Sequence, residues 1–196
     1  RQRQMCIRDR LYKLRRKFMS HADGLIHADL HTSNIMASRD KMKVIDMEFA
    51  FMGPFGYDLG YLVGNLISQY CAACFKRFPS EQSRKQFKAY LLATIQSLIE
   101  TYMKTFTLCW EKSVKERYRG QQGLLQSILQ EVMEDVPGYA SMVNWFRSVS
   151  EIPYPDFDII EDKDAKRNAT VLSLMIDWGI TVSYTHLRAH ETLMNL

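Results

Sequence analysis

The 196-residue chain lacks several features that define whole classes of protein. No apolar run approaches the roughly 20 residues that a membrane-spanning helix needs, and no charged start followed by an apolar stretch indicates a secretory signal. Internal repeats and low-complexity tracts are also missing. With 46% hydrophobic and 24% charged residues, the composition is typical of a globular domain long enough to bury a core. We therefore expect one domain, no membrane partner and a cytoplasmic location.

Cysteine is scarce, and its spacing shows no framework of disulfide pairs. The four cysteines are Cys6, Cys71, Cys74 and Cys109. This usage favours a reducing compartment. Cys71 and Cys74 form a C-x-x-C, but the stretch has a helical pattern and no second pair or histidine nearby. We interpret them as buried free thiols rather than as a metal or redox site.

The excess of positive charge is confined to one end of the chain, whose formal net charge is +4. Residues 1–10 and 183–196 resemble translated sequencing-adapter sequence, so we predict that both are artefacts and that 11–182 is the domain. Four arginines and one aspartate give the first ten residues a charge of +3, while Arg188 and Glu191 cancel. The remaining +1 does not predict a nucleic-acid surface.

The most informative stretch of the sequence is residues 27–34, HADLHTSN. Asp29 and, five residues later, Asn34 combine a possible proton acceptor with an amide oxygen that suits a hard cation. Phosphoryl transfer uses a carboxylate beside the attacking hydroxyl and magnesium on the phosphate oxygens. The stretch therefore indicates a kinase, with His27 as a structural residue that orients the loop.

A second motif follows after a short polar turn. Residues 43–48, KVIDME, are strand-like and contain the carboxylates Asp46 and Glu48. Because side chains alternate along a strand, these two carboxylates are expected on the same face, where they favour a divalent ion. We predict Asp46 as the main metal ligand, with Asn34 nearby.

Two competing interpretations apply to these motifs. Each short string also arises by chance, although the order and close spacing of the two favour one shared site. His27, His31 and Asp29 are also compatible with a transition-metal cluster, since imidazole suits zinc and iron. Only His21 lies near as a further ligand, which disfavours the cluster.

The segment after Glu48 narrows the family. Residues 49–60, FAFMGPFGYDLG, form a turn rich in glycine and proline that leads into an apolar helix at 61–67. From residue 25 to 66 the sequence resembles the methylthioribose kinase family. Members of that family carry H-G-D-L-H-T-G-S, then V-I-D-P-E-F-A-F-x-G-P-x-G-Y-D-x-G, then a helix with N-L. Choline kinases and aminoglycoside phosphotransferases share the H-x-D and the later aspartate but do not resemble the E-F-A-F and G-P-F-G run.

The resemblance implies an α+β, mainly α-helical fold. It implies the C-terminal lobe of a protein-kinase-like fold, in which a short β-hairpin is expected to carry the catalytic and metal-binding loops. Apolar positions at three- and four-residue steps predict core-facing helices over about 81–110, 121–135 and 162–178. The prolines within 153–156 exclude a continuing helix there.

The resemblance also implies an activity, which is ATP-dependent phosphorylation of the anomeric hydroxyl of S-methyl-5-thioribose in methionine salvage. Asp29 would contact this substrate as the catalytic base, while Asp46 and Glu48 would hold Mg²⁺ and the nucleotide phosphates. Asn34 is expected as a further metal ligand from its spacing in the loop, not from the resemblance. Asp58, at the start of a helix, is expected to cap that helix and to brace the catalytic loop. The expected cofactors are thus ATP and Mg²⁺, the partner is a small molecule, and a homodimer stays open.

Farther along the chain the resemblance is weaker. Residues 124–140 resemble the helix and turn that precede an arginine pair in the family. On that alignment Phe146 and Arg147 occupy the two arginine positions, so only Arg147 keeps a guanidinium to bind the sugar or the phosphoryl group. A solvated helix position is the competing interpretation for Arg147. In the catalytic loop, Ala28 replaces the glycine of the family pattern, and Asn34 is closer to general kinases.

A kinase of this fold also needs an N-terminal lobe with a glycine-rich loop and a strand lysine. The thirteen residues 11–23 leave no room for either. We therefore expect the chain to be the C-terminal half of a longer enzyme and to be inactive alone. Three interpretations remain open: a methylthioribose kinase, another sugar or amino-alcohol kinase of the same fold, and a non-catalytic kinase-like lobe used for binding.

Overall fold

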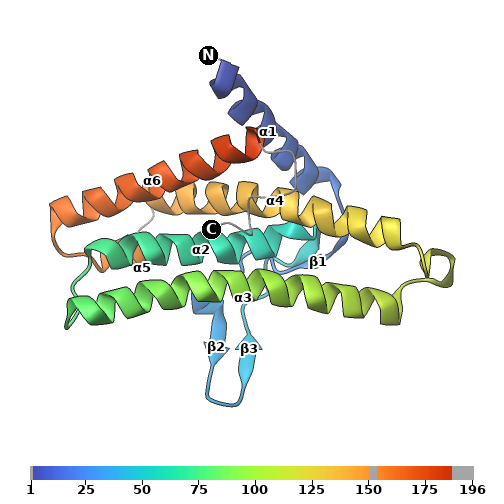
Figure 1. Ribbon diagram of the computed structural model, residues 1–196, viewed down its shortest axis with the longest axis horizontal. Coiled ribbons are helices and arrows are strands. Elements are labelled where there is room, and N and C mark those ends of the chain that lie inside the picture. Colours follow the sequence, from blue (N-terminus) through green and yellow to red (C-terminus); the bar gives the residue numbers. More distant parts are fainter. Residues whose placement is uncertain (1, 151–153, 187–196) are drawn as a thin grey trace.

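The computed structural model describes residues 2–150 and 154–186 and is mainly helical (Figure 1). The helices are α1 (Gln2–Ser20), α2 (Gly56–Phe75), α3 (Glu81–Ser113), α4 (Gln122–Val149), α5 (Pro155–Asp158) and α6 (Lys163–His186), with short 3₁₀ turns η1 (Thr32–Asn34) and η2 (Glu116–Tyr118). The strands are β1 (Gly24–Ile26), β2 (Ile35–Ala37), β3 (Met42–Val44) and β4 (Phe51–Gly53). Among the described helices, none is long and apolar enough to cross a membrane.

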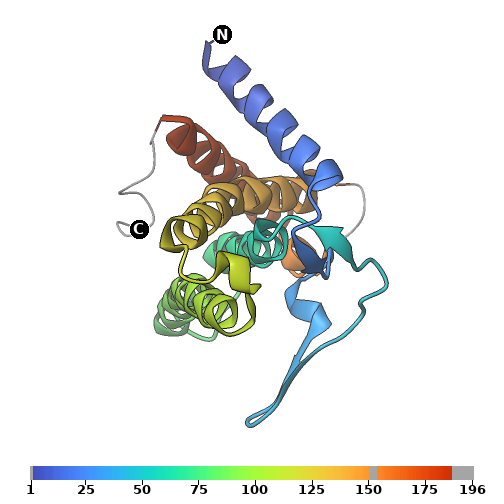
Figure 2. The ribbon, with the colours of Figure 1, turned by 90° about the vertical axis from the view of Figure 1, so that its right-hand side faces the viewer.

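The long helices α2, α3, α4 and α6 lie alongside one another, and those that follow each other in the chain run in opposite directions (Figure 1). Helix α2 is central, because it packs against α3, α4, α5 and α6. Seen end-on, the β2–β3 hairpin projects from the side of this bundle (Figure 2). The loops at the base of the hairpin are therefore placed next to α2.

Glycines on α2 allow the close approach of α4. A Cβ atom at Gly60 would lie 2.6 Å from the Tyr139 Cβ, and one at Gly64 would lie 2.5 Å from the Ala140 carbonyl oxygen. Both distances are shorter than packed carbon and oxygen atoms allow. The core at this crossing consists of Leu59, Val63, Val132, Val136 and Ala140.

Helix α4 corrects one expectation from the sequence. The pattern predicts a helix that ends at Asp135 and a turn over 137–140, but α4 continues through Pro137 to Val149. Proline in a helix interior removes a hydrogen bond and costs about 3 kcal/mol. The buried side chain of Tyr139 offsets this cost, since it packs against α2 and donates a hydrogen bond to the Leu14 carbonyl oxygen (3.2 Å).

The other three helix predictions are confirmed, and the helix expected at 61–67 lies within α2. The helix expected over 81–110 is α3, and its N-cap Ser80 accepts a hydrogen bond from the Ser83 amide. The helix expected over 162–178 is α6, which begins one residue later and continues to His186. Pro155 begins the short helix α5, as proline at a first helical position does. Residues 151–153 of the expected linker lie outside the described residues.

Two antiparallel strand pairs position the loops of the site. The sequence predicts one short hairpin, and β2–β3 provides it, with Ile35 opposite Val44. The second pair, β1–β4, was not predicted; it sets Gly24 opposite Gly53. This pairing places the residues after β1 beside the start of α2.

The cysteine interpretation is confirmed in part. Cys71, Cys74 and Cys109 are free thiols. Cys71 is fully buried, and burial raises its pKa to about 12, which keeps it protonated and unreactive. Cys74, the other thiol of the C-x-x-C, is only partly buried, and Cys109 is exposed. The side chain of Cys6 lies outside the described residues.

A carboxyl group on α6, that of Asp177, is buried in the bundle. Asp177 is 5% exposed; its Oδ1 accepts a hydrogen bond from Asn144 Nδ2 (2.7 Å), and its Oδ2 has no hydrogen-bond partner among the described residues. Burial raises the pKa of Asp177 to about 7, against the opposing effect of Asn144. The folded protein thus keeps a proton that the unfolded chain releases near pH 4.

The close crossing of α2 and α4 predicts how a methyl group added at a glycine of α2 changes the stability of the protein. We expect Gly64→Ala to lower the free energy of unfolding by about 1–3 kcal/mol, because its Cβ has no space against α4. Gly179→Ala on α6 is the matched control. Its Cβ meets open space, so it should stabilise the protein by about 0.5–1 kcal/mol. Urea unfolding measures both, and equal effects of the two variants would contradict the packing.

Asp177 predicts a pH dependence of stability. Because its pKa is higher in the folded state, the free energy of unfolding should fall as pH rises from about 4 to about 7. Asp177→Asn mimics the protonated form, so near pH 8 it should be more stable than the parent by an amount on the order of 4 kcal/mol, and near pH 4 it should be similar. Urea unfolding across this range tests it. A constant difference between the two proteins would show that Asp177 is not the group responsible.

Candidate active site

The loop of residues 27–34 is joined to α2 by the carboxylate of Asp58. The amide of His27 donates to Asp58 Oδ2 (2.6 Å), and the amide of Ala28 donates to Asp58 Oδ1 (2.9 Å). Burial raises the pKa of Asp58, and these two donors oppose that rise. Asp58 does not cap α2 as expected. The N-cap is Phe55, whereas the expected bracing of the 27–34 loop by the Asp58 carboxylate is present.

Two residues of the candidate site, one in this loop and one after strand β3, have a strained backbone. Ala28 and Asp46 adopt positive φ angles of 68° and 66°. The left-handed conformation costs a non-glycine residue roughly 1–2 kcal/mol, so it persists only where the surroundings enforce it. This geometry explains why glycine suits the position of Ala28 in the resembling family.

Asp29 lies at the centre of the loop with both carboxylate oxygens oriented. The Tyr61 hydroxyl donates to its Oδ1 (2.7 Å), while Asn34 Nδ2 and His31 Nε2 lie 3.5 and 3.4 Å from its Oδ2. Burial and the neighbouring Asp29 raise the pKa of Tyr61, so its hydroxyl stays protonated as a donor. The Asp29 side chain is 26% exposed, which leaves the carboxylate accessible to a bound molecule.

His27 connects this loop to the segment that carries Asp46. Its Nδ1 accepts the amide hydrogen of Asp29 (3.3 Å), and its Nε2 lies 2.8 Å from the Ile45 carbonyl oxygen. This pattern requires the tautomer with hydrogen on Nε2. The Ile45 amide in turn donates to the Asn34 carbonyl oxygen (3.0 Å). Asp46 is therefore held directly after a residue that bonds to both ends of the loop.

The strand argument for Asp46 and Glu48 is wrong. Strand β3 ends at Val44, Asp46 has a positive φ angle, and residues 48–49 form a turn. The strand stops because both backbone groups of Ile45 bond to the 27–34 loop instead of to a neighbouring strand. The alternation of side chains along a strand therefore does not place the two carboxylates on one face.

The oxygen ligands predicted for magnesium are compatible with that ion. Asp46 and Glu48 are exposed, and neither carboxylate forms a hydrogen bond or ion pair within the described chain. Magnesium is commonly bound by one or two carboxylates and completed by phosphate oxygens and water. With the Asn34 amide, these groups supply hard oxygen donors of the right kind.

The alternative transition-metal cluster is wrong. In the part of the chain that the structure describes, no three His, Cys, Asp or Glu side chains are grouped closely enough to hold a metal ion. Both ring nitrogens of His27 are already engaged in hydrogen bonds. A ring with no free nitrogen cannot serve as a ligand without breaking the loop.

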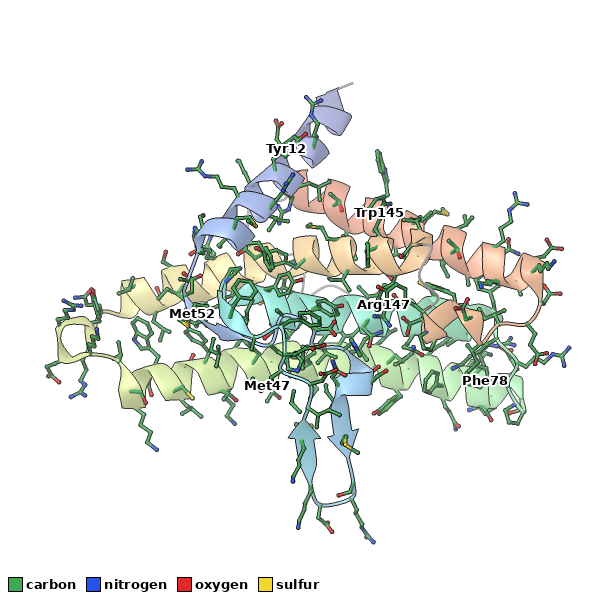
Figure 3. The ribbon with its side chains drawn as sticks, turned by 180° about the vertical axis from the view of Figure 1, so that it is seen from behind. Tyr12, Met47, Met52, Phe78, Trp145 and Arg147 are labelled. Atoms are coloured by element: carbon green, nitrogen blue, oxygen red, sulfur yellow. The ribbon has the colours of Figure 1, made fainter. Side chains whose placement is uncertain are left out.

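Arg147 is buried in the bundle and paired with a carboxylate. Figure 3 shows the position of Arg147. Arg147 is 7% exposed, and its Nε and Nη2 lie 2.6 and 2.5 Å from Asp156 Oδ2. Its guanidinium also stacks over the Tyr154 ring at 4.4 Å. The competing interpretation of Arg147 as a solvated residue is therefore wrong. Phe146, at the other arginine position, is 49% exposed and packs edge-on against Tyr154.

Sequence reasoning identified Asp58 but missed that it begins a stripe of polar residues along α2, which continues with Tyr61, Asn65 and Gln69. Asp58 and Tyr61 bond to the 27–34 loop as described above, and Asn65 Oδ1 accepts the Thr32 amide (3.0 Å). Steps of three, four and four residues in an otherwise apolar helix place these side chains on one face. This spacing, visible in the sequence, is the pattern that could have identified the polar face of α2.

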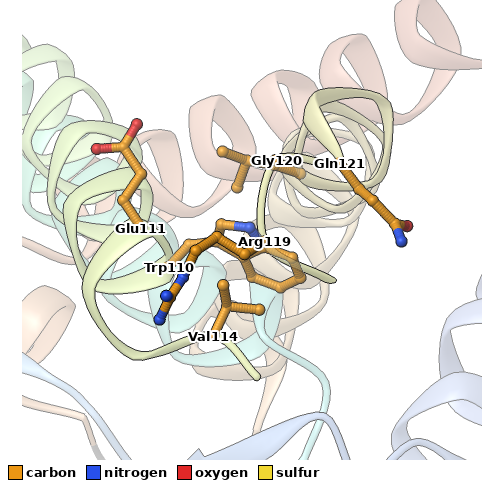
Figure 4. Close-up of a pocket in the computed structure, with 7 residues that line it drawn as sticks. Trp110, Glu111, Val114, Arg119, Gly120 and Gln121 are labelled. Carbon is orange, nitrogen blue, oxygen red and sulfur yellow. The ribbon is translucent and has the colours of Figure 1, made fainter. Parts of the chain in front are cut away.

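A separate hollow lies at the end of the bundle where the chain passes from α3 to α4 (Figure 4). Its lining residues are Trp110, Glu111, Val114, Arg119, Gly120, Gln121 and Leu125. Its volume of about 100 Å³ is below the roughly 300–1,000 Å³ of typical ligand pockets. The loops around Asp29 are therefore the stronger candidate site.

Comparisons with known proteins agree with the motifs of this site. Residues 2–98 match the phosphotransferase enzyme family. The chain is 37% identical over 192 residues to a methylthioribose kinase of Geobacillus thermodenitrificans, an alignment that covers 96% of this chain and 46% of that protein. It is 31% identical over 181 residues to the methylthioribose kinase of Pectobacterium atrosepticum, which covers 92% and 45%. The predicted resemblance is thereby confirmed. The chain spans a little under half the length of these relatives.

The anchoring role of Asp58 predicts a loss of stability. Asp58→Ala should lower the free energy of unfolding by about 2–4 kcal/mol, because two half-buried amides lose a charged acceptor. Asp58→Asn keeps one acceptor oxygen and should lose about half as much. Asp40→Ala, at an exposed position in the hairpin turn, is the control. Urea unfolding of the three variants measures this order. A loss in the control as large as in Asp58→Ala would contradict the assignment.

Proposed function

Because the chain belongs to the phosphotransferase enzyme family, we propose that the protein containing it transfers the γ-phosphoryl group of ATP to the anomeric hydroxyl of S-methyl-5-thioribose. The observation that carries the proposal is the carboxylate of Asp29, which the Tyr61 hydroxyl orients. The loop of Asp29 also bonds through Asn34 to Ile45, the residue directly before Asp46. The similarity to methylthioribose kinases supports the choice of acceptor. Because the chain spans under half the length of those relatives, the activity is assigned to the longer enzyme of which we take it to be the C-terminal part.

Asp29 is the proposed base. With Oδ1 held by the Tyr61 hydroxyl, Oδ2 is the oxygen that accepts the proton of the acceptor hydroxyl. The acceptor oxygen then forms a bond to the γ-phosphorus, the bond to the bridging oxygen breaks, and ADP leaves. Proton transfer of this kind contributes about 10²–10⁴-fold to a rate, which is why the orientation of one carboxylate matters.

Asp46, Glu48 and Asn34 are the proposed ligands of Mg²⁺ and its bound phosphates. When bound, the ion neutralises the charge that develops on the phosphate oxygens. In this proposal the residues of this chain supply hard oxygen donors to the ion. Asp46 directly follows Ile45, which bonds to His27 and Asn34.

A second candidate function is another sugar or amino-alcohol kinase of the same fold. It is favoured by one observation, which is that Arg147 is the lone guanidinium at the expected arginine pair and is engaged by Asp156. A panel of small alcohols, assayed for ATP consumption with the full-length protein, separates the two candidates. Methylthioribose should rank first, and a better acceptor would favour the alternative. The non-catalytic lobe predicts no magnesium-dependent nucleotide binding at all.

The expected cytoplasmic location and the possible homodimer stay predictions. The phosphotransferase assignment does not depend on either of them.

The assignment of Asp29 predicts a large loss of activity without a loss of folding. Asp29→Asn in the full-length protein should lower kcat by about 10²–10⁴-fold, because an amide cannot accept the hydroxyl proton. Asp40→Asn, at an exposed position in the hairpin turn, should leave kcat unchanged. A coupled ADP-release assay measures both, and circular dichroism checks the fold. Activity retained by Asp29→Asn would remove Asp29 from the role of base.

A further inference from the structure

Asp156 joins three polar side chains from two long helices inside the bundle. Its carboxylate accepts hydrogen bonds from Arg147 on α4 and from Asn65 Nδ2 on α2 (3.2 Å), and it is also paired with Gln69 on α2. Asp156 is 2% exposed and Asn65 is fully buried. A charge buried to this extent is tolerated only because it is paired and saturated with hydrogen bonds.

The same Asn65 side chain reaches the loop of Asp29 with its other end. Asn65 Oδ1 accepts the amide of Thr32, the first residue of the 3₁₀ turn η1. The last residue of that turn, Asn34, donates to the Asp29 carbonyl oxygen (3.0 Å). An asparagine can donate and accept at once, so Asn65 couples Asp156 to the backbone of the loop.

We propose that Arg147, Asp156 and Asn65 form a buried relay that positions the loop of Asp29 for phosphoryl transfer, and that Arg147 acts as a positioning residue rather than as the cation that binds the acceptor. The kinetic test of this inference rests on the proposed function, because it measures the proposed kinase activity. It replaces the substrate-binding role predicted for Arg147 with one that follows from its surroundings.

The surroundings of Arg147 favour this role over acceptor binding. Two nitrogens of its guanidinium bond to Asp156, and one face of the group is covered by Tyr154. Releasing it toward a ligand would leave the Asp156 charge buried without its partner, which is strongly unfavourable. The relay fixes Asn65, and Asn65 fixes Thr32. The orientation of Asn34 and Asp29 therefore depends on a pair that touches neither of them.

The relay predicts a particular pattern of kinetic effects in the full-length protein. Asn65→Ala and Arg147→Lys should each lower kcat by about 10- to 100-fold, since a small displacement of a catalytic group has effects of that size. The KM for the acceptor should change less than about threefold. Because both act through one chain of contacts, the double variant should be no slower than the slower single variant.

Matched controls separate this role from general damage. Arg167→Lys and Asn168→Ala change the same residue types at exposed positions of α6 and should leave kcat and KM unchanged. If Asn65→Ala does not fold, Asn65→Ser, which keeps a smaller polar group, takes its place. A role confined to stability predicts lower melting temperatures for the relay variants but an unchanged kcat per folded molecule. That outcome would overturn the proposal.

A different pattern would restore Arg147 as an acceptor ligand. In that case Arg147→Lys would raise the KM for the acceptor by tenfold or more, while Asn65→Ala would leave it unchanged. The two effects would then combine independently in the double variant. This outcome also overturns the proposal.

Hydrogen exchange tests the relay without any substrate. The amide of Thr32 should exchange at least about tenfold faster in Asn65→Ala and Arg147→Lys than in the parent, because its acceptor is lost or mobile. The exposed controls should not change it. If the full-length parent phosphorylates no acceptor in the panel, the proposed function fails while this measurement still decides the relay. Unchanged exchange at Thr32 would overturn it.

Discussion

Two hydrogen bonds from backbone amides to the Asp58 carboxylate hold the site to the bundle. They join the 27–34 loop to the first turn of α2, and the rest of the arrangement follows from where α2 lies. Tyr61, one turn farther along, orients Asp29, and Asn65, another turn on, fixes Thr32. A central helix thus presents a row of polar side chains to one short loop, and the bundle as a whole keeps that row in position.

The stiffness of this row depends on the packing of α2 on its other faces. At Gly60 and Gly64, α4 lies so close to α2 that these two positions have no space for a side chain. Arg147 on α4 then reaches Asp156, which bonds to the polar face of α2. The apolar and polar contacts of the bundle therefore support each other, since each needs the same spacing of α2 and α4.

Particular residues show how far the sequence was informative. Asp29 and Asn34 were found because a loop of fixed spacing carries them, and α3 and α6 were found because their apolar periodicity is uninterrupted. The continuation of α4 through Pro137 was missed, because a local penalty was outweighed by the burial of Tyr139 against a distant helix. The geometry of Asp46 was also missed, because Ile45 bonds to a loop rather than to a strand.

The sequence alone determined the local features of this protein. These are the carboxylates and amides of the 27–34 loop, the helices with clear periodicity and the motifs that resemble a kinase family. Only the tertiary structure decided what Arg147 does. Its charge is neutralised by Asp156, and its effect reaches Thr32 through Asn65, which lies more than eighty residues before it in the chain. Long-range hydrogen bonds depend on how helices pack, and packing is a property of the whole fold rather than of any local pattern.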